Sequence, residues 1–309
     1  MTEPSRSDLR GQVARLVASG SSNQVGAALG AHAFPVMGPA GVVGIRQIVA
    51  SVTLWSIARP PVARWTSREF GPVVLLAAVL STMNLSLYAA ISRVGLGLAV
   101  TLEFLGPLAV SLLASRSKRD LAIALFAAAG VYILVLPDGS SDIVGFALAV
   151  LAAGCWAAYI LLNRVVGSRV QGLQAPAVAT AISAVIYTPV LVQLAWHGRL
   201  WGPALCYAIG TGVLSSVVPY AVDLTVLRTV PPKLFGVLMS MQPGLAALSG
   251  MVLLAQVPSA HEWLGMAMIV CANVAAVGVG VPRRWGPRSR RSLRPRTGRA
   301  PLGAVSLDA

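Results

Sequence analysis

Long apolar runs recur along the whole chain. Each holds about 20 mostly apolar residues, which is the length an α-helix needs to cross the hydrocarbon core of a bilayer. Composition agrees, because 56% of the 309 residues are hydrophobic and only 11% are charged, against about 25% in soluble domains. The sequence therefore predicts an all-α polytopic membrane protein with ten transmembrane helices. The ten runs are 16–36, 41–58, 71–91, 95–114, 121–137, 143–162, 173–194, 203–223, 233–256 and 262–281.

The first run is the weakest of the ten, because residues 19–24 are polar, and without it the count would be nine. Basic residues divide unequally between the two sides that ten runs define. With residues 1–15 in the cytoplasm, 21 of the 24 Lys and Arg residues fall in cytoplasmic segments. Only Arg93 and Arg199 fall outside, and Arg46 lies within a run. Since cytoplasmic loops carry an excess of basic residues, we expect both termini in the cytoplasm, and no nucleic-acid partner is needed to explain the net charge of +14.

Two segments of the chain resemble each other. "YAAISRVGLGLAVTLEFLGPLAVSLLA" (88–114) and "YAVDLTVLRTVPPKLFGVLMSMQPGLAALSGMVLLAQ" (220–256) both begin with Tyr-Ala and place a proline inside an apolar run. Pro107 and Pro243 correspond at an offset of 136 residues. Five spans in each half is an odd number, so the halves would be inverted-topology five-helix repeats. The expected domains are a cytoplasmic N-terminal segment (1–15), two five-helix repeats (16–137 and 143–281) and an Arg-rich disordered tail (282–309). The tail would lie on anionic lipid, with nucleic-acid binding as its alternative role.

A carboxylate and two helix breakers lie inside the fourth run. Glu103 is followed by Gly106 and Pro107, and Pro107 frees the carbonyl of Glu103 from helical hydrogen bonding. Freed backbone at membrane depth needs protein partners or a wet cavity, and interrupted helices at matching positions of two repeats mark the central site of transporters. We therefore expect a polar cavity beside Pro107 and Pro243, with a plain packing kink as the alternative.

Three charged residues are candidates for binding or coupling. Glu103 is interior to its run and would bind a proton or a cation, or serve as a structural partner for a basic group. Arg46 would bind a substrate carboxylate through its bidentate fork, with outward snorkelling or a structural pair with Glu103 as alternatives. Asp223 is the weaker candidate, since it could lie at the interface near Arg228.

Neutral polar and aromatic residues would line the same cavity, although each is also compatible with simple helix packing. They are Asn84, Tyr88, Trp156, Tyr159 and Gln242, with His32 and Tyr220 as further members. No catalytic motif and no metal-ligand spacing is present, so we expect neither an enzyme nor a cofactor or metal. The three cysteines, Cys155, Cys206 and Cys271, are expected as small core residues rather than disulfide partners.

Segments 83–110, 219–250 and 44–50 resemble the EamA-type branch of the drug/metabolite transporter superfamily, and most of all its threonine/homoserine exporter group. The resemblance covers nearly all of 20–280. It implies ten helices in two inverted repeats and export of amino acids from a bacterial cytoplasm through the plasma membrane. Two positions differ from the pattern of the family, because Gln242 and Gln256 replace glutamates. Asp223 stands where an acidic residue is common, and Glu103 matches the pattern.

The resulting prediction is a secondary exporter of a small-molecule substrate, most of all an amino acid such as threonine or homoserine. Alternating access of the two repeats around a midplane site would drive it, with proton coupling through Glu103, and the chain would work as a monomer or homodimer in the lipid bilayer. One alternative is an exporter of drugs or cationic compounds. The other is a membrane assembly partner that transports nothing.

Overall fold

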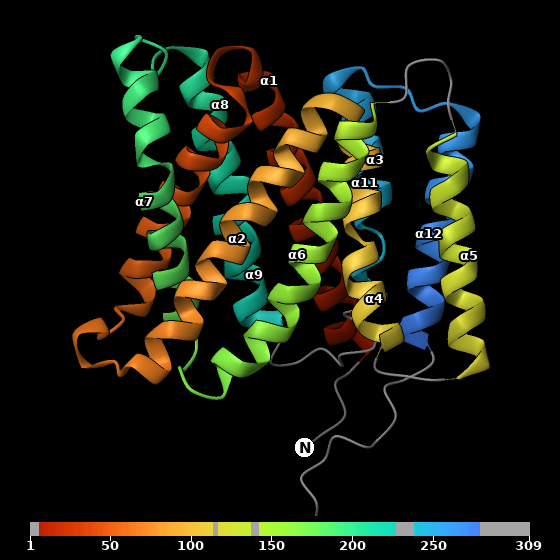
Figure 1. Cartoon of the computed structure of the whole chain (residues 1–309), viewed down its shortest axis with the longest axis horizontal. Coiled ribbons are helices and arrows are strands. Elements are labelled where there is room, and N and C mark those ends of the chain that lie inside the picture. The colour runs from red at the N-terminus through yellow and green to blue at the C-terminus, as the bar shows by residue number, and fades with distance from the viewer. Residues whose placement is uncertain (1–5, 114–116, 137–141, 227–237, 279–309) are drawn as a thin grey trace, which may run out of the picture.

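The computed structural model describes residues 6–113, 117–136, 142–226 and 238–278, and these residues form helices without any strand (Figure 1). A 3-10 turn spans Val62–Arg64 and a π-helical turn, η2, spans Val213–Val217. The α-helices are α1 (Arg6–Ala58), α2 (Ser67–Val94), α3 (Leu96–Glu103), α4 (Leu105–Leu113), α5 (Lys118–Leu134), α6 (Ile143–Gly167), α7 (Gln174–Trp196), α8 (Pro203–Gly212), α9 (Val218–Val226), α11 (Gln242–Leu254) and α12 (Ala260–Gly278).

Helix α1 is a hairpin of two helical arms. Gly38 interrupts it with φ 67° and ψ 168°, between Pro35 and Pro39. A Cβ atom on Gly30 would lie 3.1 Å from Val42 Cγ1, although twelve residues of straight helix would separate the two by about 18 Å. The first arm (6–37) and the second arm (39–58) therefore run side by side in opposite directions, as the predicted runs 16–36 and 41–58 require.

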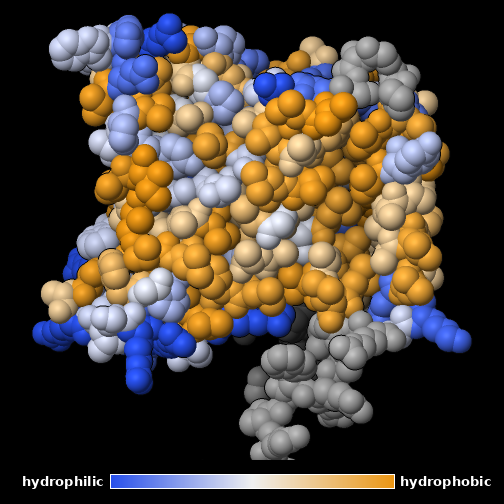
Figure 2. Space-filling model, in the orientation of Figure 1, coloured by the Kyte–Doolittle hydropathy of each residue, from blue (hydrophilic) through white to orange (hydrophobic). Residues whose placement is uncertain are grey.

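Seven helices in the described part of the chain are long and apolar enough to cross a membrane. Other predicted spans correspond to shorter elements, since α5 has 17 residues and α11 has 13, and the first two spans are joined in α1. Apolar side chains cover most of the face shown in Figure 2, while hydrophilic residues gather at its upper and lower ends. The architecture is that of a polytopic membrane protein. The arrangement of ten spans in two inverted five-helix repeats stays a prediction.

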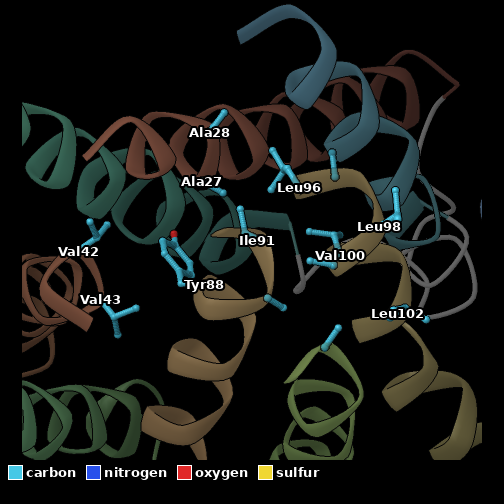
Figure 3. Packing of buried hydrophobic residues seen from close by; sticks show 14 of the residues in the cluster. Ala27, Ala28, Val42, Val43, Tyr88, Ile91, Leu96, Leu98, Val100 and Leu102 are labelled. Atoms are coloured by element: carbon cyan, nitrogen blue, oxygen red, sulfur yellow. The ribbon is translucent and has the colours of Figure 1, made fainter. Parts of the chain in front are cut away.

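The helices pack through small residues, as expected where lipid removes the hydrophobic driving force between helices. Helix α2 packs along α6, α1 along α7 and α8, and α5 along α12. The largest buried cluster gathers Tyr88, Leu96 and Val42 with alanines of α1 (Figure 3). The residues labelled in Figure 3 come from α1, α2 and α3, and the cluster extends from them to α7, α8, α11 and α12.

The expectation for the cysteines is wrong for two of them. Cys206 and Cys271 are exposed, and only Cys155 is partly buried. In a membrane protein the apolar outer surface faces lipid, so an apolar environment in the sequence does not imply burial within the protein. Strongly exposed apolar residues such as Leu113 (83%) and Val52 (65%) illustrate the same point.

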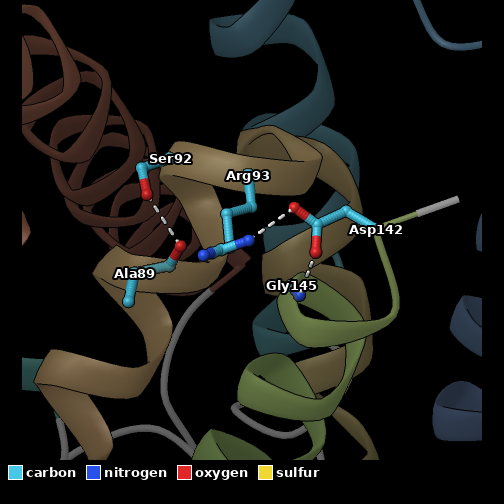
Figure 4. Close-up of polar contacts among 5 residues, drawn as sticks. All are labelled: Ala89, Ser92, Arg93, Asp142 and Gly145. Atoms are coloured by element: carbon cyan, nitrogen blue, oxygen red, sulfur yellow. Dashed lines mark hydrogen bonds and ion pairs between the residues drawn. The ribbon is translucent and has the colours of Figure 1, made fainter. Parts of the chain in front are cut away.

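An ion pair joins the end of α2 to the start of α6. Arg93 Nη1 donates to Asp142 Oδ2 at 2.8 Å, and the backbone N–H of Gly145 donates to Asp142 Oδ1 at 2.9 Å (Figure 4). Asp142 is thus the N-cap of α6. The Gly145 N–H, and then Arg93, hold the pKa of the Asp142 carboxyl below its usual range.

Candidate functional site

The fourth predicted run is broken into α3 and α4. Helix α3 ends at Glu103, Phe104 forms the turn, and α4 starts at Leu105. Pro107 falls in the first turn of α4, where its missing N–H leaves no helical bond unmade. Gly106 lies against α6, since a Cβ atom there would overlap the carbonyl oxygen of Ala153.

A second break precedes the other proline. Ser240 and Met241 form a turn, and α11 starts at Gln242 with Pro243 in its first turn. Phe104 and Ser240 each lie three residues before their proline. The two interruptions therefore occupy the same place relative to Pro107 and Pro243, and residues beside both of them line one cavity.

This central cavity has a volume of about 270 Å³. Helices α1, α2, α3, α6, α9 and α11 and the turn η2 contribute to its wall. Eight of the residues singled out from the sequence line it: Arg46, Asn84, Tyr88, Glu103, Trp156, Tyr159, Tyr220 and Gln242.

Two other candidates fall elsewhere. His32 lines a different hollow nearer the end of α11, where its Nε2 donates to the Leu253 carbonyl at 3.0 Å. Asp223 belongs to α9, and its side chain lies outside the described part of the structure, as does Arg228.

Arg46 makes its contacts with neutral acceptors. Its Nη1 donates to Asn84 Oδ1 at 2.9 Å and to the Tyr88 hydroxyl at 3.2 Å. Its Nε donates to Ser216 Oγ and its Nη2 to the Ser215 carbonyl, each at 3.1 Å. The guanidinium carbon also lies 5.4 Å from the centroid of the Tyr88 ring, within cation–π range.

Of the five N–H donors of Arg46, four are used in these contacts, so one on Nη2 is left over. The guanidinium is held in one orientation without any carboxylate partner among the described residues. Within the described segments, therefore, no acidic side chain in contact with Arg46 neutralises its positive charge.

Glu103 is the acidic counterpart in the same cavity. Its side chain is 7% exposed, and in the described segments neither a hydrogen bond nor an ion pair connects its carboxylate to another residue. The structure does not bring Glu103 and Arg46 to within ion-pair distance, so the structural pairing considered from the sequence is not formed. Both side chains nevertheless line the same cavity.

Aromatic rings bound the cavity beside Glu103. Phe104 follows it directly and meets Trp156 edge to face, with ring centroids 4.7 Å apart and an interplanar angle of 86°. This geometry is favourable for aromatic pairs. Trp156 thus packs the cavity face of α6 against the turn between α3 and α4.

The sequence reasoning missed the polar wall that α1 and η2 supply. Ser215 and Ser216 lie in the π-helical turn, and such turns concentrate at functional sites. Ser215 Oγ donates to the Asn23 carbonyl at 2.7 Å, and Ser22 Oγ donates to the Leu214 carbonyl at 2.9 Å. The further polar lining residues are Ser19, Asn23, Gln24 and Gln47.

A signal for this wall was present. The polar stretch at residues 19–24 was read as a weakness of the first span, yet three of its members line the cavity. Polar residues inside a membrane span are expensive unless they face a cavity or a partner. The π-helical turn, in contrast, has no recognisable sequence signature here.

Gln24 and Gln242 connect α1 to the second break. Gln24 Nε2 donates to Gln242 Oε1 at 2.7 Å, and both side chains are at most 6% exposed. Glu103 and Arg46 are the two charged residues that line the cavity in the described part of the chain. Its wall therefore carries one positive and one negative group among neutral amides, hydroxyls and aromatic rings.

Comparison with known proteins shows which family this chain resembles. The EamA-like transporter family matches residues 143–277. The threonine/homoserine exporter RhtA of Salmonella typhimurium (strain LT2) is 35% identical over 264 residues, which cover 83% of this chain and 88% of that protein. RhtA of Escherichia coli (strain K12) is 34% identical over 265 residues, covering 84% and 89%. The uncharacterized transporter YwfM of Bacillus subtilis (strain 168) is 27% identical over 225 residues, covering 67% and 76%.

One solved crystal structure matches with a TM-score of 0.58 over 89% of this chain and 98% of that chain. At 18% identity it supports the fold alone. The sequence relatives are transporters, so this chain is a transmembrane transporter and not an enzyme. Because a relative of at least 30% identity extends over most of both chains, the protein belongs to the EamA-like transporter family, close to the threonine/homoserine exporters.

Proposed function

We propose that the protein exports a zwitterionic amino acid, such as threonine or homoserine, from a bacterial cytoplasm by proton-coupled alternating access. The observation that carries the proposal is the central cavity, in which Arg46 and Glu103 provide one unpaired charge of each sign beside two helix breaks. The identity to threonine/homoserine exporters supports the substrate class.

The charge balance of the cavity favours a zwitterion. An amino acid carries a carboxylate and an ammonium group, which complement Arg46 and Glu103 respectively. The substrate carboxylate would take the N–H that remains on Arg46 Nη2, and a bidentate grip would require release of the Ser215 carbonyl. A lipophilic cation would leave the Arg46 charge unmatched, and this disfavours the drug-exporter alternative.

Glu103 also suits proton coupling. It ends α3, and the C-terminal end of a helix carries partial negative charge that favours a cation nearby. A proton and a substrate ammonium would then compete for the same carboxylate. Such competition is the simplest basis for antiport, since only one of the two occupies Glu103 in each half-cycle.

The proposed topology has ten spans, with both termini in the cytoplasm of the bacterial cell. The two arms of α1 supply spans one and two, and α3 with α4 supplies span four. The segment that joins the second arm to α2 lies at the lower end of Figure 1. It carries Arg59 and Arg64, and Arg68 follows in the first turn of α2. Their position agrees with a cytoplasmic lower end under the positive-inside rule.

Uptake into inside-out vesicles tests the proposal. Radiolabelled threonine, homoserine, lysine and a lipophilic cation are supplied with and without a pH gradient, for the wild type and for Glu103→Gln. We expect gradient-dependent accumulation of threonine or homoserine by the wild type alone. Glu69→Gln is a matched control, because Glu69 is partly exposed in the first turn of α2 and does not line the cavity. Accumulation of the lipophilic cation without any amino acid would replace this proposal by the drug-exporter alternative.

A further inference from the structure

A thin layer of residues separates the central cavity from the upper end of the molecule. Two hollows open above it. The larger, of about 790 Å³, lies between α1, α2 and the end of α11, and the smaller, of about 300 Å³, lies beside α3 and α11. Gln256 lines both hollows.

The layer is about one helical turn thick. On α1, Ala27 lines the cavity and Ala31 lines the larger hollow, about 6 Å apart along the helix. On α2, Tyr88 lines the cavity and Ile91 lines the hollow, about 4.5 Å further along.

Helix α3 repeats this arrangement. Its residue Val100 lines the cavity, and Gly97 lines the smaller hollow three residues away. The layer at this level is buried and mostly made of small residues. We call it the barrier, and it consists of Ala28, Tyr88, Leu96, Ala99, Ala246 and Ala247, each at most 2% exposed.

Helices α3 and α11 approach each other closely in the barrier. A Cβ atom on Gly97 would lie 3.0 Å from the Cα of Ala247. Only glycine allows this approach without displacing the other backbone. The two helices each begin or end at one of the breaks that line the cavity, so their lower ends face substrate while their upper ends close the barrier.

Gln256 connects the upper ends of α3 and α11 through a hydrogen bond. Its Oε1 accepts a hydrogen bond of 2.9 Å from the backbone N–H of Leu96, the first residue of α3. It therefore satisfies one of the N–H groups that a helix leaves unpaired at its start. Gly95, at φ 85°, and Gly250 leave room for this amide, since a Cβ on either would lie about 3 Å from Gln256 Oε1.

We propose that the upper ends of α3 and α11 separate to release substrate through the smaller hollow, which both helices line, and that Gln256 is the positioning residue that holds them closed. This inference uses the proposed function only in taking the upper end as the outside of the cell. His32 adds a second connection, from the first arm of α1 to the Leu253 carbonyl near the end of α11.

A disulfide across the two helices tests the separation. A Cβ on Gly250 would lie 3.6 Å from Leu96 Cβ, within the range of disulfide bonds. The double variant Leu96→Cys with Gly250→Cys is made in a background where the three native cysteines are replaced by serine. We expect oxidation to lower transport at least tenfold and reduction to restore it, whereas oxidation leaves each single variant unchanged. Quantitative cross-linking with undiminished transport would refute the proposal.

A second measurement needs no substrate. Ala27→Cys places a thiol in the cavity, and a membrane-impermeant maleimide added to intact cells reports how often the barrier opens. Gln256→Ala should raise the labelling rate about two- to tenfold, the effect of one neutral hydrogen bond. Gln256→Glu should keep the rate of the parent, because a carboxylate also accepts from the Leu96 N–H.

The outcomes separate the two proposals. If the oxidised disulfide and Gln256→Ala both leave the labelling rate at the parent value, the gate is wrong. If the labelling rate changes as expected while no amino acid is transported, the gate formed by α3 and α11 is supported and the proposed substrate class is wrong.

Discussion

Gln24 Nε2 donates a 2.7 Å hydrogen bond to Gln242 Oε1 and so joins the first arm of α1 to the break before α11. Both residues line the central cavity. A neutral amide at position 242 leaves Arg46 and Glu103 as the two charged residues in the described wall of the cavity, and this balance is the basis of the selectivity proposed above.

Gln242→Glu should shift selectivity toward cationic substrates. The new carboxylate still accepts from Gln24, so the fold is retained, but the cavity gains a negative charge. We expect threonine transport to fall and lysine transport to rise, so that their ratio changes by about tenfold or more, the effect of one charge-assisted hydrogen bond. Competition between the two labelled amino acids in vesicles measures the ratio. Gln171→Glu, in an exposed turn, is the control, and equal ratios in both variants would contradict the argument.

Arg46→Lys should impair transport although it keeps the positive charge. Lysine has no planar fork, so it cannot reach Asn84, Tyr88 and the Ser215 carbonyl together as Arg46 does. We expect about a tenfold to hundredfold loss of kcat/KM, the range of one charge-assisted hydrogen bond. Initial rates in proteoliposomes check this. Arg199→Lys, in the segment between α7 and α8, should behave as wild type. A fully active Arg46→Lys would show that the charge alone matters.

Gly106→Ala should destabilise the protein by about 1–3 kcal/mol, the usual cost of overpacking. The added methyl group would overlap the Ala153 carbonyl oxygen and push α4 away from α6. Gly154→Ala lies on α6 with no neighbour within 4 Å of the added Cβ, so it should be neutral or slightly stabilising through its better helix propensity. Thermal unfolding in detergent compares the two. Similar melting temperatures would mean that α4 can shift without cost.

The Asp142–Arg93 pair should make stability depend on pH under acid conditions. The folded-state pKa of Asp142 is lowered by the Gly145 N–H and by Arg93, so its contribution is complete above the ordinary aspartate value of about 3.9. The contribution is lost as pH falls through the lowered folded-state pKa. Melting temperatures of wild type and Asp142→Asn, measured from pH 6 downward, should therefore converge in strong acid. A constant difference at every pH would rule out the charge as its cause.

Much of the fold followed from local pattern. Length and apolar content located the helices, because lipid offers no hydrogen-bond partners and a spanning segment must pair its own backbone N–H and C=O groups. Pro107 and Pro243 marked the two breaks to within three residues. In a helix interior the proline ring clashes with the preceding turn, and proline has no N–H to donate, so a helix tends to break there. Burial within the protein could not be predicted from the same pattern, as Cys206 and Cys271 show. An apolar side chain in a membrane protein is stable both in the protein interior and against lipid.

The sequence by itself determined which charged residues inside a span had to be shielded from lipid, namely Glu103 and Arg46, because an uncompensated charge at membrane depth is costly. Only the tertiary structure decided which polar groups form hydrogen bonds with one another. It placed Arg46 among Asn84, Tyr88 and Ser215 rather than beside Glu103, and it set Gln256 on the first N–H of α3, 160 residues away. These partners depend on how distant helices cross, and no local pattern specifies that.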